Sequence, residues 1–437
     1  MTSRTEERPF RIAMAVASPF PANHGTPGSI REMAEAIAAR GHVVHVVAYH
    51  FGDGPPPPGV EVHHIPDLGL GRKVTVGPTW QKPLQDLQMV LTLRRVVKEQ
   101  KADLIHAHNY EGALVGYLAH LLTGRPLLYN ACNTMGDELT SYGFLPAFIA
   151  SPLAKTLDYV VPRLPDTTVA VSEDLARFLL AQGVRKERLH AIPLGIDPGI
   201  FDRVDQEAAR RKVRGDDPRP IVIYTGCLDG LQRIDYLLQA MREVLPHMSG
   251  VRLLLLANAV KDRDRSRYLE MARELGIASQ LEIVESDTFE DVPVYLAASD
   301  VAVVPRPACP GFPVKLLNYL AAGRPTVVSA GSSKGLTDGE NALLTPDHDP
   351  QALGRGILDL LQNKEKAARL GRNGRLFVEA RYAWPVLTDR MLGVYRELLG
   401  PRTASAEPLV EAEPASSLAK RETTSGKSLT SPTPTSK

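Results

Sequence analysis

The sequence predicts an α/β protein with two Rossmann-like, doubly wound domains, and three observations support this fold class. Apolar runs of strand length alternate with helical periodicity from residue 12 onward, as in parallel sheets. The alternation begins afresh at residues 220–226, after a connector. The chain has 437 residues, which is too long for one hydrophobic core of usual size.

The first predicted domain opens with a β-loop-α unit. Residues 12–17 form an apolar run of strand length, residues 18–27 are rich in Pro, Asn and Gly, and a helical period follows until Gly41. The next strand is predicted at residues 42–49. The later elements of this domain are strands at 104–107, 126–129, 167–171 and 189–192, and helices at 114–122 and 173–182, the last with Ser172 as its N-cap.

The second series follows the connector at residues 193–198 and repeats the same alternation. Its strands are predicted at 220–226, 251–257, 281–284, 301–304 and 326–329, with helical sequence between them. Two doubly wound domains of this kind bind ligands at the carboxyl ends of their strands, and a cleft between them is a preferred ligand site.

Composition excludes several classes of function. A net charge of +1 gives no global reason to expect nucleic acid as a partner. Cys132, Cys227 and Cys309 are far apart, and no histidine stands at metal-ligand spacing, so we predict neither disulfides nor a metal site. Because the apolar run at 12–17 is shorter than a signal-peptide core and no run reaches the ~20 residues of a membrane span, we expect a cytoplasmic protein.

The most informative motif lies at residues 310–329. Gly311 lets the backbone approach a ligand, and Pro313 suits a first helical position, so the amides that follow would point toward an anion. Gly323 would end this helix before a β-branched strand. The motif therefore predicts a diphosphate site, although an ordinary helix and strand of an α/β core would show the same pattern.

Several stretches together resemble the retaining nucleotide-sugar glycosyltransferases of family 4, which have the GT-B fold. The resemblance covers roughly residues 10–400. Besides the motif at 310–323, the stretches are 41–42, 103–108, 192–197, 335–344 and 382–384.

The resemblance implies a domain organisation and a class of activity. The N-terminal domain, residues 1–195, would lie on the acceptor side, and residues 196–380 would bind the nucleotide sugar across a cleft. Residues 381–400 would form a helix that crosses back to the N-terminal domain. The remaining residues, 401–437, are rich in Ser, Thr, Pro, Glu and Lys, which predicts a disordered tail.

The chain departs from its family at two donor-binding motifs. The family usually has an Arg and a Lys five positions apart after the first strand of the second domain, where this chain has Cys227 and Gln232. It also has two Glu eight positions apart, where this chain has Pro310 and Asn318. The amide of Asn318 can still hydrogen-bond a ribose, but Pro310 offers the donor sugar no polar side chain.

Nearby cations are candidates to replace the missing pair. Lys315 is the best placed, since it lies in the first helical turn beside the free amides, and it is our catalytic candidate in this half. Arg233 and Arg306 are weaker candidates, and a place on the solvated surface is the alternative for all three. The donor-binding residues that we predict are Gly25, Gly226, Gln232, Arg233, Gly311, Phe312, Val314 and Asn318.

In the N-terminal half, the resemblance makes His108 the catalytic candidate beside the transferred sugar. His108 follows the strand at 104–107, and His106 lies on the same face. Gly25 and Thr26 belong to a glycine-containing loop that the family places near the diphosphate and the acceptor. Glu111 is an acceptor-side candidate that would pair with the acceptor or with the histidine.

The predicted function is sugar transfer from a nucleotide-diphosphate donor to a glycan or lipid-linked acceptor, with no cofactor and no metal. A catalytically silent nucleotide- or glycan-binding partner is the rival, because both donor motifs are lost. An epimerase or phosphorylase on this fold is a third alternative that no residue pattern favours. Residues 142–164, with the basic residues near Arg94, predict a peripheral contact at the inner face of a membrane, although a core helix fits them equally.

Overall fold

We describe the fold from a computed structural model of the chain. The residues that it describes are 8–21, 25–52, 55–67, 69, 81–136, 139, 146–257, 260, 262–286, 291–307 and 313–400. The tail predicted to be disordered, 401–437, lies outside this set. Among the helices described, none combines the length and the apolar composition needed to cross a bilayer.

The first sheet has seven parallel strands in the order β3-β2-β1-β4-β5-β6-β7. We did not predict the edge strand β3 from the sequence, because three of its five residues are polar, two histidines and a glutamate, and it therefore lacks the apolar run of a buried strand. The strands are β1 (Arg11–Val16), β2 (Val43–Ala48), β3 (Val60–His64), β4 (Leu104–His108), β5 (Leu127–Ala131), β6 (Thr167–Ala170) and β7 (Leu189–Ala191).

The second sheet has six parallel strands in the order β10-β9-β8-β11-β12-β13. The sequence predicted all of them except the short edge strand β13. The strands are β8 (Ile221–Thr225), β9 (Arg252–Ala257), β10 (Leu281–Glu285), β11 (Val301–Val304), β12 (Thr326–Ser329) and β13 (Leu343–Thr345).

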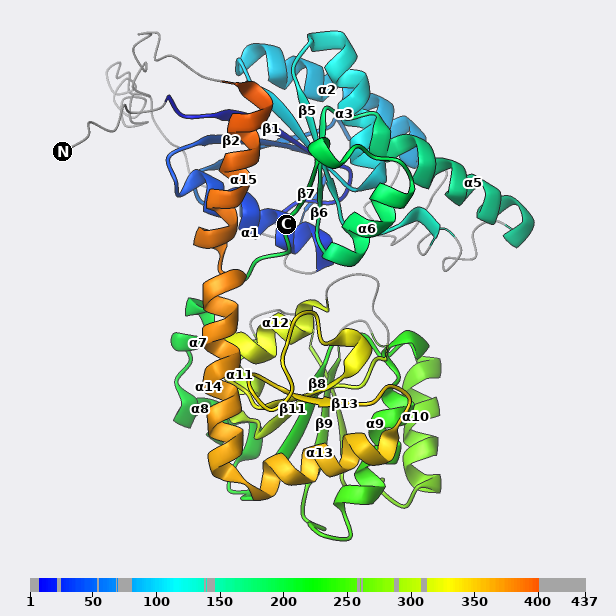
Figure 1. Cartoon of the computed structure of the whole chain (residues 1–437), viewed down its shortest axis with the longest axis vertical. Coiled ribbons are helices and arrows are strands. Elements are labelled where there is room, and N and C mark those ends of the chain that lie inside the picture. The colour runs from blue at the N-terminus through cyan, green and yellow to red at the C-terminus, as the bar shows by residue number, and fades with distance from the viewer. Residues whose placement is uncertain are drawn as a thin grey trace, which may run out of the picture. The chain divides into compact units, whose positions relative to one another are not determined.

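Helices cover both faces of each sheet (Figure 1). Those in the first half are α1 (Gly25–Ala38), α2 (Lys82–Glu99), α3 (Asn109–Thr123), α5 (Ala147–Val160) and α6 (Glu173–Ala181), with the short turns η1 (Val161–Arg163) and η2 (Lys186–Arg188). Those in the second half are α7 (Gly199–Asp202), α8 (Gln206–Arg214), α9 (Ile234–Val244), α10 (Asp262–Glu274), α11 (Asp291–Ala298), α12 (Val314–Ala321), α13 (Pro350–Gln362) and α14 (Lys364–Arg381), with the turns η3 (Gly230–Gln232) and η4 (Ala330–Ser332). The last helix is α15 (Trp384–Leu399).

The first sheet has a separate apolar core on each face. On one face, Met14 and Val16 of β1 pack with residues of α1 and with Tyr395 of α15. On the other, Ala15 packs with residues of α2 and α3. Gly112 brings α3 close to the sheet, since a Cβ there would lie 2.9 Å from the Ala15 carbonyl oxygen. Helix α15 therefore completes the core of the first sheet although it follows the second sheet in sequence.

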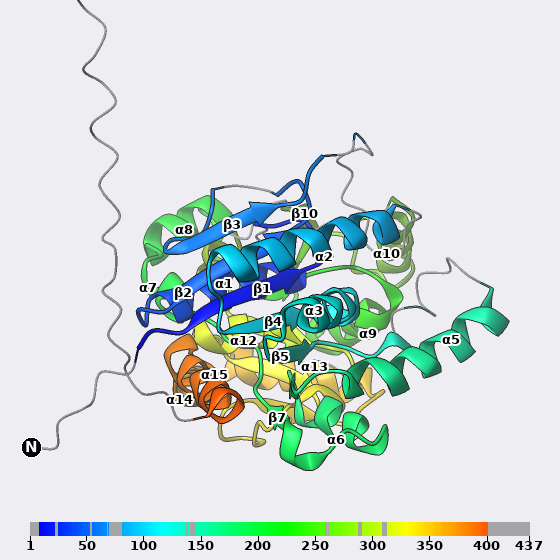
Figure 2. The ribbon, with the colours of Figure 1, turned by 90° about the horizontal axis from the view of Figure 1, so that it is seen from above.

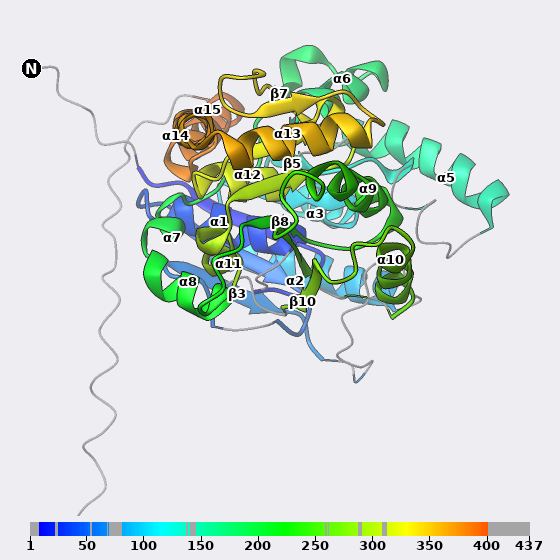
Figure 3. The ribbon, with the colours of Figure 1, turned by 90° about the horizontal axis from the view of Figure 1, so that it is seen from below.

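The second sheet is built in the same way. Its α9 and α13 pack together over one face, which Figure 3 shows from below, and α12 covers the other. The hydroxyl of Tyr319 in α12 accepts a hydrogen bond of 2.7 Å from the backbone N–H of Thr225. This bond fixes the position of α12 against the end of β8.

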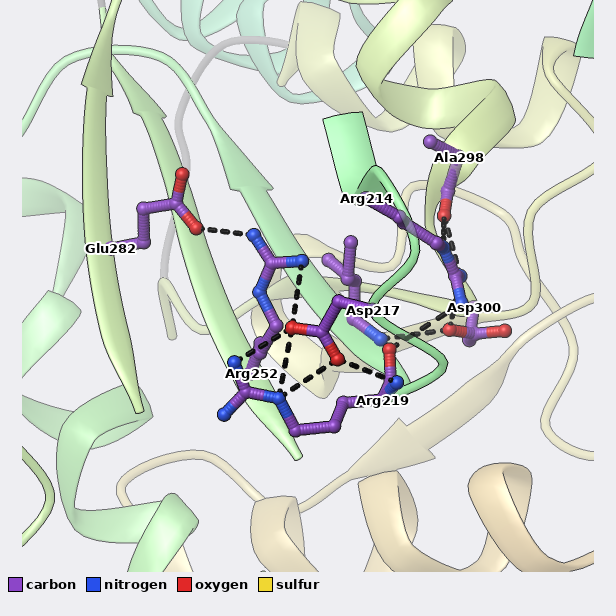
Figure 4. A network of polar contacts seen from close by, with 8 residues as sticks. Arg214, Asp217, Arg219, Arg252, Glu282, Ala298 and Asp300 are labelled. Atoms are coloured by element: carbon purple, nitrogen blue, oxygen red, sulfur yellow. Dashed lines mark hydrogen bonds and ion pairs between the residues drawn. The ribbon is translucent and has the colours of Figure 1, made fainter. Parts of the chain in front are cut away.

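A charged network ties α8 to the second sheet (Figure 4). Arg214 at the end of α8 pairs with Asp300 at 2.6 Å, and Asp300 also accepts from the backbone N–H of Ile221 at the start of β8. Beside it, Arg252 pairs with Glu282 at 2.6 Å. These contacts lie at the amino ends of the strands. They stabilise the second half of the chain away from the carboxyl ends, where doubly wound sheets bind ligands.

Two local predictions were wrong. The segment 25–29 is the first part of α1 and not a loop, because a proline among the first residues of a helix loses no hydrogen bond. Pro313 is the N-cap of α12 and not its first residue, since its ψ of 97° is extended. The predicted end of that helix is confirmed, with Gly323 in the left-handed region at a φ of 64°.

Candidate active site

In each sheet the strand order reverses beside its first strand, between β1 and β4 and between β8 and β11. Such switch points open a crevice at the carboxyl ends of the strands, where doubly wound proteins bind ligands. His108 ends β4, and Gly226 follows β8. His108 and Gly226, both singled out from the sequence, therefore lie at the switch points.

Lys315 reaches from α12 to the end of β8. Its Nζ donates to the Tyr224 hydroxyl at 2.6 Å and to Oε1 of Gln232 at 2.7 Å. It also lies 4.3 Å from the centroid of the Tyr224 ring. The ammonium group thus lies beside position 232, where the resemblance to family 4 implies a lysine.

Gly226 makes room for this ammonium group. Its φ of 120° suits glycine, and a Cβ there would lie 3.3 Å from Nζ of Lys315. Val314 and Asn318 lie on the same helix, Val314 half-buried at its start and Asn318 buried. Gly311 and Phe312 lie outside the described residues. The structure therefore brings Gly226, Gln232 and Lys315 together at one strand end.

The guanidinium group of Arg233 already has partners in the second half of the chain. It pairs with Asp235 at 2.7 Å, and its guanidinium carbon lies 3.4 Å from the centroid of the Tyr236 ring. The carboxylate of Asp235 raises the pKa of Arg233, so the side chain keeps its charge but already has a partner. Arg306 is half-buried just after β11.

His108 is fully buried at the end of β4. Nδ2 of Asn130, the neighbouring residue on β5, lies 3.2 Å from Nδ1 of His108, and burial lowers the pKa of the imidazole to about 3. With the amide nitrogen of Asn130 donating to Nδ1, the proton of the neutral ring is on Nε2. That buried N–H has no hydrogen-bond partner among the described residues. His108 thus offers a neutral donor at the switch point.

His106 connects His108 to α15. The two imidazole rings stack with centroids 4.3 Å apart, and Nδ1 of His106 lies 2.8 Å from the Tyr395 hydroxyl. Burial also lowers the pKa of His106. The sequence placed both histidines on one face, but it gave no sign that Tyr395, far along the chain, would contact them.

The acceptor-side candidates have other surroundings than we predicted. Glu111 pairs with Lys82 of α2 at 3.1 Å, and not with a histidine. Thr26 is half-buried in α1, in the same turn as Gly25. Nearby, the hydroxyl of Tyr49 donates to Asp86 at 2.7 Å near the start of α2, a contact that we did not predict. Burial raises the pKa of Asp86 to about 6.

Three potential metal ligands converge elsewhere. Nδ1 of His45 on β2 lies 3.1 Å from the Glu61 carboxylate and 3.2 Å from Nε2 of His63, both on β3. We expected no metal site from the sequence, and this stays a prediction. Adjacent strands bring these three residues together although they are far apart along the chain. The cluster lies within the strands and not at their carboxyl edge, so we assign it no part in the site.

A half-buried carboxyl group of α1, that of Glu32, lies against the connection that follows the first half. Ile196 bridges to Ala383, and Nε1 of the adjacent Trp384 donates to Glu32 of α1 at 2.8 Å. Burial raises the pKa of Glu32 to about 7, despite the hydrogen bond from Trp384. A proton on Glu32 therefore accompanies the packed form of this junction.

Two doubly wound sheets, each with candidate ligand residues at its switch point, define a protein of the GT-B class. Two family models match the chain. The "Glycosyl transferase 4-like domain" matches residues 25–195, and "Glycosyl transferases group 1" matches residues 205–377, so together they cover more than three quarters of the sequence.

Similar proteins agree with these matches. The chain is 24% identical over 389 residues to a D-inositol 3-phosphate glycosyltransferase of Segniliparus rotundus, covering 85% of this chain and 84% of that protein. It is 27% identical over 405 residues to one of Geodermatophilus obscurus, covering 87% and 85%. The chain belongs to the family-4 glycosyltransferases and is an enzyme of that class.

Solved structures share the fold at low sequence identity. Sucrose-phosphate synthase from Thermosynechococcus elongatus matches with a TM-score of 0.72 and 22% identity, covering 89% of this chain and 99% of that one. Anabaena Alr3699/HepE in complex with UDP and glucose matches with a TM-score of 0.70 and 17% identity, covering 89% and 100%. At these identities the likeness establishes the GT-B fold alone.

Proposed function

We propose that this enzyme transfers a sugar from a nucleoside diphosphate donor to a glycan or lipid-linked acceptor, with retention of anomeric configuration. The observation that carries the proposal is the position of Lys315. Its ammonium group stands at the end of β8, between Gly226 and Gln232, where the family pattern has cations. A lysine recruited from α12 thus fills the space left by the family lysine.

The chemistry requires positive charge at this point. As the bond between sugar and diphosphate breaks, negative charge grows on the departing oxygens, and preorganised donors aimed at them lower the barrier. Lys315 would supply one full charge. The amides at the start of α12 would supply partial charges in the same direction. Gln232 would hold Lys315 in place and leave its own amide N–H groups for a phosphate oxygen.

His108 would act on the sugar and not on the phosphate. Its Nε2–H would donate to a hydroxyl or ring oxygen of the transferred sugar. Because burial keeps this imidazole neutral, it adds no second cation near the positive charge that develops on the sugar. Asn130 fixes the tautomer that makes this possible.

The proposal also covers the acceptor, the metal requirement and a contact with a membrane. The relatives named above make inositol 3-phosphate the first acceptor to assay, with lipid-linked sugars next. We propose that no metal ion or cofactor is needed, since Lys315 supplies the charge, and that excess EDTA leaves the rate unchanged. We also propose a peripheral membrane contact through α5, which exposes Phe148 and Leu153.

A thermal-shift panel tests the donor class directly. Uridine, guanosine and adenosine diphosphate sugars would be compared, beginning with UDP because the Anabaena neighbour was solved with it. A ligand at about 100 times its Kd stabilises a protein by about 2.7 kcal/mol, which is an easily measured shift. NMR of the anomeric proton of the product would establish retention.

The silent-partner alternative predicts a different combination of results. It would bind nucleotide and show no transfer to any acceptor, because the motifs lost at Cys227 and Pro310 would then be needed for the reaction. No shift with any nucleotide sugar would contradict the proposed transfer and would favour a silent partner that binds a glycan.

A further inference from the structure

Exposed leucines gather on two neighbouring helices of the first half. On α2, Leu84, Leu87 and Leu91 recur at helical spacing along one solvent-facing stripe, and Leu91 is 60% exposed. Helix α3 packs beside α2, as Figure 2 shows from above, and carries a second stripe. Its exposed leucines are Leu114, Leu118, Leu121 and Leu122.

Helix α5 continues this apolar surface next to α3. Ala150 and Ala154 of α5 belong to the same apolar core as Ala113 of α3, so the rest of the α5 surface faces outward. That surface exposes Phe148, which is 78% exposed, and four further large apolar residues, Ile149, Leu153, Tyr159 and Val160. Of the 16 large apolar residues that are exposed in the described part of the chain, 12 lie on these three helices. A surface this apolar marks an interaction site.

The charges beside the stripes are mostly positive. The α2 stripe continues from Leu91 to Arg94 and Lys98 at the same helical spacing, and both are exposed. Arg95 and Lys101 are also exposed there, and Arg125 follows α3. The exposed acid among them is Glu99, since Asp86 and Glu111 are partly buried and paired with Tyr49 and Lys82.

We propose that α2, α3 and α5 form one docking surface for a bilayer that contains anionic lipid. The leucines would enter the boundary between headgroups and acyl chains, and Arg94 and Lys98 would lie against the headgroup phosphates. A protein partner would need complementary pockets, whereas a bilayer accepts a broad, convex array of leucines flanked by cations. In choosing a membrane as the partner, this inference rests on the proposed function and extends the contact proposed for α5.

Vesicle co-sedimentation of the full chain tests the surface. The wild type would be compared with Leu91→Ser/Leu121→Ser, and Leu376→Ser on α14 is the matched control because Leu376 is 62% exposed and Leu121 is 61% exposed. We expect the partition coefficient of the double variant to fall roughly tenfold or more, because two leucine side chains that would be buried in the bilayer are replaced by serines. Leu376→Ser should partition like the wild type.

The charge variant separates the two components of binding. Arg94→Glu/Lys98→Glu should weaken binding to vesicles that are about one third phosphatidylglycerol and leave the weak binding to pure phosphatidylcholine unchanged. About 0.5 M salt should reduce wild-type binding in the same way. A charge variant that binds both vesicles like the wild type would contradict the role given to the cations.

Further outcomes decide the identity of the partner. Equal partitioning of the wild type and the leucine double variant would overturn the proposal. So would a wild-type dimer in sedimentation velocity that the double variant abolishes, because the surface would then join two copies of the chain. Nucleotide affinity, measured by calorimetry on the same variants, should not change. Vesicle binding without nucleotide binding would overturn the proposed function alone.

Discussion

The two switch points are built alike, but one carries a neutral donor and the other a positive charge. At the first sheet, His108 is buried, neutral and held by Asn130 and the stacked ring of His106. At the second, Lys315 places an ammonium group among the polar groups of Tyr224 and Gln232. A transferase has to hold an uncharged sugar and a highly charged diphosphate at once. Under the proposed function, this difference would place the sugar at the first sheet and the diphosphate at the second.

Removing the cation should have the largest effect. We expect Lys315→Ala to lower transfer about 100-fold or more, because a preorganised donor to the leaving group is lost, and to weaken nucleotide binding about tenfold. Steady-state kinetics and calorimetry measure the two effects. Lys212→Ala, which removes a surface lysine paired with Asp291, should change neither. Arg233→Ala should lie between them, since Asp235 already holds that guanidinium group.

Replacing the neutral His108 should lower the transfer rate without changing nucleotide binding. His108→Asn should lower transfer about 10- to 100-fold and leave the nucleotide Kd within about twofold. Because the pKa of His108 is about 3, the wild-type rate should show no inflection from this residue between about pH 5 and 8. An inflection in that range that disappears in His108→Asn would show that the imidazole is charged, and would contradict the contrast.

The junction near Glu32 should show a pH effect on stability. Its pKa rises from 4.5 to about 7 on folding, so the folded state keeps a proton that the unfolded state loses. Stability should therefore fall as the pH rises from about 4.5 to about 7, by up to about 3 kcal/mol. Glu32→Gln should make this fall smaller, as measured by urea unfolding at each pH, and leave the part that comes from Asp86, whose pKa burial raises to about 6. Glu207→Gln on the exposed side of α8 should follow the wild-type curve.

The contact from α15 should have the smallest effect. Tyr395→Phe leaves Nδ1 of His106 without its hydroxyl partner, which should cost about 1–2 kcal/mol of stability. If His106 positions His108 through the stacked rings, kcat should also fall a few-fold while the nucleotide Kd stays the same. A loss of stability with kcat unchanged would reduce this contact to a packing role.

Much of the fold could be predicted from the sequence because buried parallel strands are continuous apolar runs. The two missed strands, β3 and β13, lie at sheet edges, where Val60–His64 alternates with polar residues and Leu343–Thr345 is only three residues long. The loop predicted at 18–27 overlaps α1 because its Thr-Pro-Gly sequence is typical of turns and also of helix starts. Local composition alone does not distinguish the two.

The site was less predictable, because its contacts join residues that are far apart in sequence. The position of Lys315 was inferred from the start of a helix, but its contact with Gln232 spans 83 positions and needed the structure. The contact between His106 and Tyr395 spans 289 positions. Glu111 was predicted to pair with the acceptor or with a histidine, whereas it pairs with Lys82 on the neighbouring helix.

A charge-rescue measurement tests the central claim most directly. In Lys315→Ala, the second substitution Gln232→Lys returns an ammonium group to the same space from the position where related enzymes have it. Calorimetry with the diphosphate of the preferred nucleotide should show that the double variant recovers most of the affinity lost in Lys315→Ala. An affinity that Lys315→Ala does not lower, or that Gln232→Lys does not restore, would contradict the claim that Lys315 replaces the family cation.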